Sequence, residues 1–525
     1  MSSKGCGGFV DAFRDGGISR RALVRRATAA GLSVGAATLL ANQVAANDAT
    51  PGASPAAGTT PATGAARPGG RSINREEYNR LIRDTFDLTP PEVTGGQVIY
   101  GASADIGTLN PHLADDVLTG IVVGSIFESL VGINPTNGFP APGLADYWEL
   151  ADDGVTYTFH LDPNARWHDG EPVTADDVVF SFEATLDPDS LGGYQSTVGG
   201  VLASYRALDD QTVELVARSP SAVFIESSAL AVPIVPRHLW EHIPPSDWGA
   251  DPGSTGQDPD RVIGSGPFRF VEWVAEDHVT LARNEAYRDP EAIPYIDEFI
   301  YRVIPTASIA TDALRTGEVD ISRVSFSEID ALEGDPDLNI AAYDSPGWTQ
   351  LVMNQDPDQT SLFIDIPVRQ ALMYGLDRQL IADEIFFGYA TPANGTQHPL
   401  SIAHDESRIN TIYTYDPERA RALLDDAGWV VGDDGIREKD GVRFNFECVY
   451  AENVDPRRQI LTYAQQAWKD IGIEMQPIAL PFQSLIDLFD TGEYEMVLNG
   501  FSWGVDGSQG DIFRCDAVPP AGFNT

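Results

Sequence analysis

The stretch GQVIYGASADIGTLNPHLADDV, residues 96–117, decides how this chain folds. Residues 98–100 form a short apolar run after a glycine pair, which predicts a buried strand. Gly101 and Gly107 are expected to turn the backbone, and Asn110-Pro111 ends any regular element. The strand should therefore lead into a polar loop that carries aspartates. In open α/β sheets, ligands bind just beyond such strand ends.

Regular elements follow this stretch along the chain. Apolar side chains alternate with polar ones over residues 155–161, which predicts a strand with one buried face. Thr174 and Asp177 resemble a capping box, so a helix should follow them. A helix is expected over residues 307–316, ending at Gly317. Further strands are predicted at residues 212–216, 268–273, 279–282, 296–304 and 495–498.

The C-terminal half shows the clearest helix signals. Asp416-Pro417 with Gly428, and Asp455-Pro456 with Gly472, combine an N-cap, a first-turn proline and a C-terminal glycine. Strands at 444–450 and 473–480 flank the second helix. This strand–helix–strand order predicts an α/β unit.

A series of short motifs resembles the family 5 solute-binding proteins, the peptide- and nickel-binding receptors of ATP-binding cassette importers. It is the order of the motifs, from about residue 95 to the end of the chain, that makes the resemblance specific. The motifs are Leu109-Asn110-Pro111-His112, Phe127-Glu128-Ser129-Leu130, Leu144-Ala145-Asp146-Tyr147-Trp148, Tyr157-Thr158-Phe159-His160-Leu161, Trp167-His168-Asp169-Gly170, Val173-Thr174-Ala175-Asp176-Asp177-Val178, Gly264-Ser265-Gly266-Pro267-Phe268, Val368-Arg369-Gln370-Ala371-Leu372 with Asp377-Arg378, and Trp503-Gly504-Val505-Asp506.

The resemblance implies an α/β, two-lobed periplasmic-binding-protein fold with an inserted small third domain. Family members continue beyond the Trp-x-x-Asp motif, so the C-terminal part of the second lobe is expected to be missing from this sequence. The expected divisions are a signal peptide at 1–46, a flexible Ala/Pro/Thr-rich linker with a short helix at 47–94, lobe I at 95–127 plus 262–344, the inserted domain at 128–261, and lobe II at 345–525.

The N-terminus is interpreted as an export signal. Ser19-Arg20-Arg21-Ala22-Leu23 has a twin-arginine pattern, and a weakly apolar run follows it over residues 27–46. Val44-Ala45-Ala46 suits a signal peptidase, and no lipoprotein cysteine follows. We therefore expect a periplasmic or extracytoplasmic protein.

Composition excludes several classes of partner. The chain has 525 residues with 78 acidic and 34 basic side chains, a net charge of −44. Such a surface repels nucleic acid and anionic membranes. The length is enough for more than one lobe. After export, Cys448 and Cys515 could form a disulfide, or Cys515 could pair elsewhere.

Candidate ligand-binding residues come from the resemblance. Asp506, with Trp503 and Gly504 in the same motif, falls where peptide receptors bind the ligand's α-ammonium, and a carboxylate in a drier cleft attracts a cation strongly. The alternative is a solvated loop aspartate. The other candidates, each of which has a surface or core role as its alternative, are Asp115, Val117, Tyr194 and Phe482.

Two motifs that suggest catalysis are rejected. His238, Glu241 and His242 match an inverted zinc-peptidase pattern, but flanking prolines leave room for only one helical turn. The glycines of 264–267 lack the Lys-Ser/Thr of a phosphate loop and predict a tight turn. No catalytic residue, metal site or cofactor is predicted.

The sequence therefore predicts a receptor that closes two lobes over a peptide-like ligand and delivers it to the permease and ATPase subunits of an importer. A monomer is expected. A metal chelate or an oligosaccharide remains an alternative ligand, and a secreted hydrolase is the alternative from another class.

Overall fold

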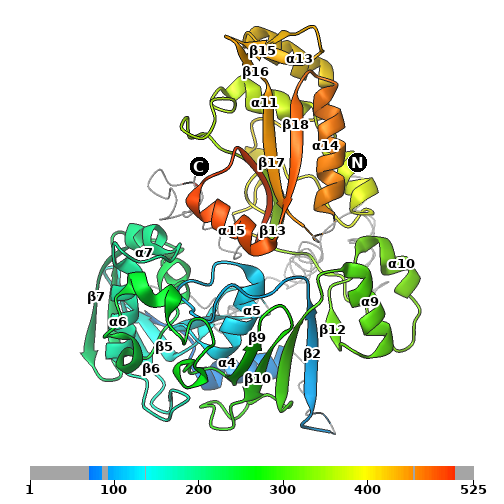
Figure 1. Ribbon diagram of the computed structural model, residues 1–525. Helices are drawn as coiled ribbons and strands as arrows, with labels where there is room; N and C mark the ends of the chain where they lie inside the picture. The colour runs from blue at the N-terminus through cyan, green and yellow to red at the C-terminus, as the bar shows by residue number, and fades with distance from the viewer. Residues whose placement is uncertain are drawn as a thin grey trace, which may run out of the picture.

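The protein is described by a computed structural model over residues 70–85, 91, 93–135, 137–401, 403–452, 454, 456–502 and 513. Three main sheets organise these residues, and we name each by one of its inner strands: the β2 sheet, the β6 sheet and the β17 sheet. In Figure 1 the β17 sheet and its helices lie above the other two sheets, and α15 (Phe482–Thr491) lies on the side that faces them. None of the described helices is long and apolar enough to cross a membrane.

The β2 sheet has the order β12-β2-β11-β10-β9, and β2 runs parallel to both of its neighbours. Its core packs α5 against the sheet through Val122, Ile126, Leu281 and Tyr301. The elements are β2 (Gln97–Ala102), α5 (Val117–Ile126), β9 (Phe268–Val274), β10 (His278–Arg283), β11 (Glu298–Val303), α9 (Ala307–Thr316), β12 (Ile321–Ser322) and α10 (Ile329–Leu332). Gly317 ends α9 with a φ of 72°, as its position predicts.

One prediction in the opening stretch is wrong. Gly101 does not turn the backbone but lies inside β2, paired with Arg302 and Ser322. A Cβ at this position would lie 3.2 Å from the Ser322 hydroxyl, so the glycine allows β12 to approach closely. The strand itself is confirmed, but residues 98–100 are only partly buried.

The β6 sheet is antiparallel, with the order β1-β5-β6-β8-β7. Along β6 buried and partly buried residues alternate, which confirms the predicted two-faced strand. Asp177 accepts a hydrogen bond from the Thr174 backbone at 2.8 Å, which confirms the capping box of α6. The elements are β1 (Gly70–Arg71), α4 (Arg75–Thr85), the hairpin β3 (Val131–Ile133) and β4 (Pro140–Pro142), β5 (Ala145–Leu150), β6 (Thr156–Leu161), α6 (Ala175–Leu186), α7 (Gln195–Val201), β7 (Leu202–Asp209), β8 (Thr212–Ala217) and α8 (Arg237–Trp240).

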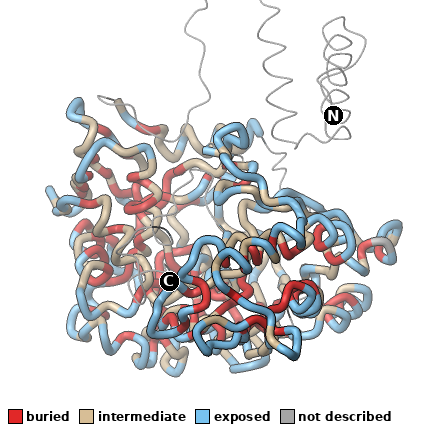
Figure 2. Tube along the Cα trace, turned by 90° about the horizontal axis from the view of Figure 1, so that it is seen from above, coloured by how far each residue is buried: buried red, intermediate tan, exposed pale blue. Residues whose placement is uncertain are grey.

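The β17 sheet, with the order β13-β19-β17-β18, confirms the predicted strand–helix–strand unit. Successive residues of β17 face opposite layers: Phe446 and Cys448 pack with α14, whereas Val449 packs with α15. Helices thus cover both faces, as the three parallel strands β19, β17 and β18 require. The elements are β13 (Gly347–Met353), α11 (Ile366–Tyr374), α12 (Arg378–Leu380), α13 (Pro417–Asp426), β14 (Val430–Val431), β15 (Arg437–Lys439), β16 (Val442–Arg443), β17 (Asn445–Ala451), α14 (Arg457–Lys469), β18 (Glu474–Leu480), α15 and β19 (Met496–Ser502). Figure 2 shows buried positions along the interior of the molecule and exposed positions on its outer loops.

Candidate functional site

The carboxyl ends of three parallel strands meet at one edge of the β17 sheet, which we call the ligand edge. β17 leads there into α14, β18 leads into α15, and β19 ends at Ser502. The antiparallel β13 starts at the same edge, since Gly347 pairs with Ser502. This is the edge of an α/β sheet at which ligands bind.

The loop after β2 faces the ligand edge. The side-chain amide of Gln483, in the first turn of α15, donates to the Asp105 carbonyl at 3.5 Å. A Cβ on Gly107 would lie 2.7 Å from the Gln483 side-chain oxygen, so this glycine allows the two segments to touch. The predicted polar loop thus lies against the β17 sheet unit.

Four carboxylates gather where α5 meets α15: Asp115, Asp116, Asp487 and Asp490. Asp116 caps α5 and accepts the backbone N–H groups of Leu118 and Thr119, each at 2.9 Å. The side chains of Asp115 and Asp490 hydrogen-bond to each other, so one of them must carry a proton.

The protonation of this cluster follows from its surroundings. Burial, followed by the nearby Asp115 carboxylate, raises the pKa of Asp490 to about 8. Burial also raises the pKa of Asp115, while the hydrogen bond to Asp490 opposes that shift. The predicted site residue Asp115 is therefore placed at the contact between the β2 and β17 sheet units, and its partner Asp490 was not found from the sequence.

A second residue that the sequence reading missed is Arg457, the first residue of α14. Within the described part of the chain, its buried Nη1 has no hydrogen-bond partner, and its guanidinium makes no ion pair. Burial lowers its pKa to about 10. A Cβ on Gly500 would lie 3.6 Å from its Nη2, so the side chain reaches the end of β19. A buried cation without a counter-charge is costly, and an anionic ligand group would remove that cost. The sequence signal that could have identified Arg457 is its position at the start of the helix that follows the β17 loop.

The remaining candidates fall in different places. Phe482 begins α15 and packs partly buried beside Leu485, while Val117 begins α5 and is 52% exposed. Tyr194 precedes α7 and packs against the core of the β6 sheet. Trp503, Gly504 and Asp506 lie outside the described residues; β19 ends directly before them.

The rejected motifs have structural roles. α8 is a single four-residue turn, and His238 contacts Asp169 at 2.8 Å. The described residues hold no group of three or more metal-ligating side chains. A Cβ on Gly264 would lie 2.0 Å from the Ile126 carbonyl, so this turn serves close packing. Cys448 is a buried free thiol whose pKa is raised by burial, and Cys515 lies outside the described residues.

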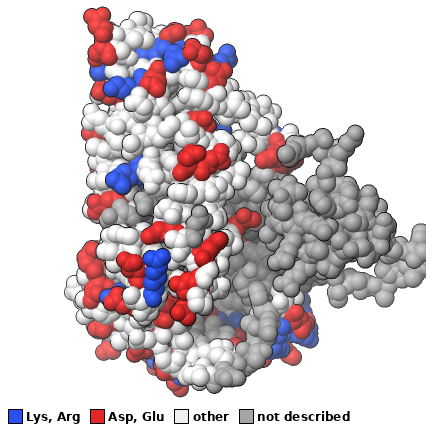
Figure 3. All heavy atoms as spheres, turned by 90° about the vertical axis from the view of Figure 1, so that its right-hand side faces the viewer, with Lys and Arg blue, Asp and Glu red and all other residues white. Residues whose placement is uncertain are grey.

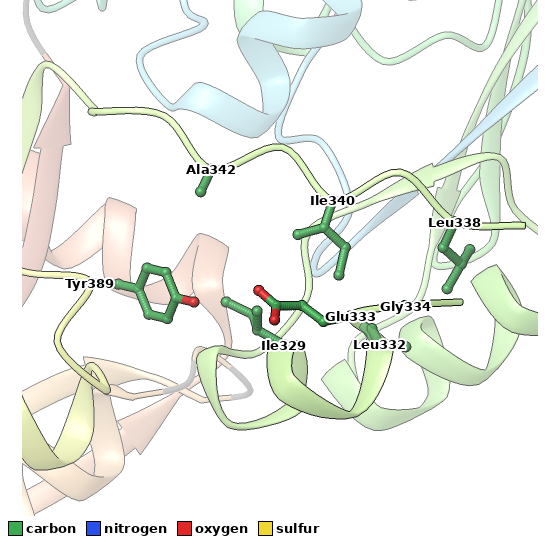
Figure 4. Close-up of a pocket in the computed structure, with 8 residues that line it drawn as sticks. All are labelled: Ile329, Leu332, Glu333, Gly334, Leu338, Ile340, Ala342 and Tyr389. Carbon is green, nitrogen blue, oxygen red and sulfur yellow. The ribbon is translucent and has the colours of Figure 1, made fainter. Parts of the chain in front are cut away.

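A separate hollow of about 210 Å³ lies between α10 and Tyr389. Figure 4 shows the Glu333 carboxylate and the Tyr389 hydroxyl among mostly apolar side chains. It shares no lining residue with the candidates named above; the lining residues are Ile329, Leu332, Glu333, Gly334, Leu338, Ile340, Ala342 and Tyr389. Figure 3 shows acidic side chains spread over one face of the molecule, in keeping with the net charge of −44.

Residues 140–521, most of the chain, match the family described as bacterial extracellular solute-binding proteins, family 5 Middle. The chain belongs to this family. The predicted α/β two-lobed fold class is confirmed, because solved family structures share it. The oligopeptide-binding protein AppA of Bacillus subtilis is 28% identical over 427 residues, covering 81% of this chain and 77% of AppA.

Relatives of this family 5 protein were solved with, or are named for, different solutes. The structure of AppA with a nonapeptide matches with a TM-score of 0.76 at 26% identity, covering 82% of this chain and 83% of that one. NikZ from Campylobacter jejuni, in complex with Ni(L-His), matches with a TM-score of 0.69 at 26% identity, covering 82% of this chain and 83% of that one. The glutathione-binding protein GsiB of Pectobacterium atrosepticum is 28% identical over 450 residues, covering 83% of this chain and 81% of GsiB.

Proposed function

We propose that this chain is an extracytoplasmic receptor that captures a peptide-like ligand between two closing lobes and delivers it to an importer. The permease and ATPase subunits would be its partners, and the chain itself would catalyse no reaction. Lobe I would comprise residues 95–127 and 262–344, with residues 128–261 inserted and lobe II from residue 345. Ligand binding would favour the closed arrangement by contacting both lobes.

The observation that carries this proposal is the guanidinium of Arg457 at the ligand edge, whose buried Nη1 has no hydrogen-bond partner among the residues that the structure describes. Acidic groups gather at the contact between the β2 and β17 sheet units, where Asp115 on the β2 side meets Asp490 of α15. A ligand with both an anionic and a cationic group would suit this distribution, and a peptide carries both. Asp506, directly beyond β19, is our candidate partner for the α-ammonium, with Trp503 and Gly504 beside it.

The relatives support a peptide and keep one alternative open. AppA was solved with a nonapeptide and GsiB is named for glutathione, whereas NikZ holds Ni(L-His). Histidine in that chelate also bears a carboxylate, so Arg457 would suit a metal chelate as well. An oligosaccharide would leave Arg457 without a counter-charge, which makes it a poorer fit.

Mass spectrometry of the solutes released from the purified protein is the direct test of ligand class. Recovery of peptides is expected; recovery of a nickel chelate or a sugar instead would overturn the peptide assignment. Cleavage of the recovered peptides on incubation with the protein, abolished by a chelator, would favour a hydrolase.

Arg457 offers a sharper test with a matched control, since the neighbouring Arg458 is exposed. Calorimetry would compare the recovered peptide as a free acid and as a C-terminal amide. Arg457→Met should weaken binding of the free acid by about 2–5 kcal/mol, and Arg458→Met should leave it unchanged. Equal binding of acid and amide by the parent protein would rule out Arg457 as the carboxylate partner.

Export by the twin-arginine route, signalled by Arg20 and Arg21, belongs to the same proposal. It would bring the folded receptor to the compartment where its solute is found.

A further inference from the structure

The segment before the β2 sheet, residues 70–85, spans two sheets. Its strand β1 adds to the edge of the β6 sheet, where Gly70 pairs with Leu150 and Arg71 with Glu149. Ser72 continues the pairing: its N–H donates to the Trp148 carbonyl at 2.8 Å, and its hydroxyl accepts the Trp148 N–H at 3.0 Å. The segment thus satisfies backbone groups that an edge strand would otherwise leave open.

The helix α4 is attached by polar contacts. None of its residues is fully buried, and Tyr78, Leu81 and Ile82 are partly buried, so apolar burial holds it only in part. Asn74 and Glu77 cap its start, each side chain accepting the other's backbone N–H at 2.9 Å. The capped end is then positioned by Asp146 of β5, which accepts the Arg75 backbone N–H at 2.9 Å.

The Arg75 side chain, 14% exposed, links the two sheets. Its guanidinium lies 3.6 Å from Asp162, which follows β6, and 3.6 Å from Asp289, in the β10–β11 loop of the β2 sheet. It also donates to the Gly143 carbonyl. Asn79 adds a second bond to Asp289, at 3.0 Å.

The Arg75 guanidinium is also needed to balance the charge of a neighbouring ion-pair network centred on Arg288. Arg288 donates to the Glu128 carboxylate through Nη1 and, at 2.7 Å, through Nη2, and its Nε lies 3.7 Å from Asp162. Arg288 and Arg75 thus form the ion pairs of three acidic groups, Glu128, Asp162 and Asp289. Loss of Arg75 would leave Glu128 and Asp162 with Arg288 alone, and Asp289, whose side chain is 4% exposed, with no ion-pair partner among the described residues. Removing one partner from a poorly solvated ion pair is strongly destabilising.

We propose that residues 70–85 form a strap that fixes the β6 sheet to the β2 sheet, so that the two sheets move as one body. Glu128 lies just beyond α5, and Asp115 lies just before that helix. The strap would therefore also hold α5 in place, and with it Asp115, which contacts Asp490 of the β17 sheet unit. If the β2 and β6 sheets move as one body, the β17 sheet unit is the body that moves during lobe closure. This step rests on the proposed receptor function.

Hydrogen exchange on the full-length protein tests the strap. Arg75→Met should speed amide exchange in β5 and in residues 284–292 by about tenfold or more, because both are held through Arg75. Exchange in β17 should not change. Arg83→Met is the matched control: Arg83 also pairs with the β10–β11 loop, through Glu291, but both side chains are about half exposed.

Equal exchange in Arg75→Met and the parent, or equal effects of Arg75→Met and Arg83→Met, would overturn the proposal. If Arg75→Met does not fold, Arg75→Lys keeps the charge with fewer donors and should give a smaller increase confined to the same two segments. An increase spread over the whole chain would also refute the strap. Ligand binding is not measured, so the result stands or falls separately from the proposed receptor function.

Discussion

Replacing Asp490 with asparagine should stabilise the protein at alkaline pH and leave its stability unchanged near pH 4. In the folded protein the pKa of Asp490 is raised to about 8. The causes are burial, the Asp115 carboxylate with its hydrogen bond, and the charges of Asp487 and Asp116. In the unfolded chain an aspartate has a pKa of roughly 3.9. The folded protein therefore binds a proton more tightly than the unfolded chain. The contribution of protonated Asp490 to the free energy of unfolding is fully present below about pH 4 and is lost as the pH rises towards 8.

The size of the effect follows from the shift and from solvent exposure. A rise in the pKa from roughly 3.9 to about 8 corresponds to at most roughly 6 kcal/mol. Asp490 is only partly buried and shares the proton with Asp115, so screening reduces the expected gain from Asp490→Asn to about 1–2 kcal/mol at pH 8.5. The asparagine amide can still donate a hydrogen bond to Asp115, so the shape of the contact is kept.

Differential scanning calorimetry between pH 4 and pH 9 measures this prediction. The unfolding temperature of Asp490→Asn should match that of the parent near pH 4 and exceed it progressively above pH 6. Asp487→Asn is the control, because Asp487 is exposed and should give a smaller gain. An equal gain at pH 4 and pH 8.5, or a loss of stability at pH 8.5, would refute the reasoning about the shared proton.

Three further predictions address binding, stability and export. Asp506→Asn should weaken binding of peptides with a free amino terminus by roughly 2–5 kcal/mol, and calorimetry should show that N-acetylation matters much less to the variant; an unaffected variant would exclude Asp506 as the ammonium partner. Arg288→Met should cost about 3–5 kcal/mol of stability by leaving Glu128, whose side chain is 15% exposed, without an ion-pair partner, and adding Glu128→Gln should restore part of it in urea unfolding; no recovery would argue against the pair. Replacing Arg20 and Arg21 with lysine should abolish export in cell fractionation, and undiminished export would contradict the twin-arginine interpretation.

Local elements were predictable because their signals are local. Alternating side chains over residues 155–161 identified β6, and Gly317, which adopts a φ of 72°, ended α9 where predicted. Gly101 was misread because glycine permits both a turn and a close approach of two strands. Only the presence of β12 beside it decides between them.

The sequence by itself determined the fold class and the family, through an ordered series of motifs, and many of the individual strands and helices. Tertiary structure alone decided which distant charges meet. The carboxyl groups of Asp115 and Asp490 meet, Arg457 has no counter-charge among the described residues, and Arg75 joins two sheets, because chain segments far apart in sequence converge there. The energies of such contacts depend on burial and on distances of a few ångströms, and neither is encoded by the spacing of residues along the chain.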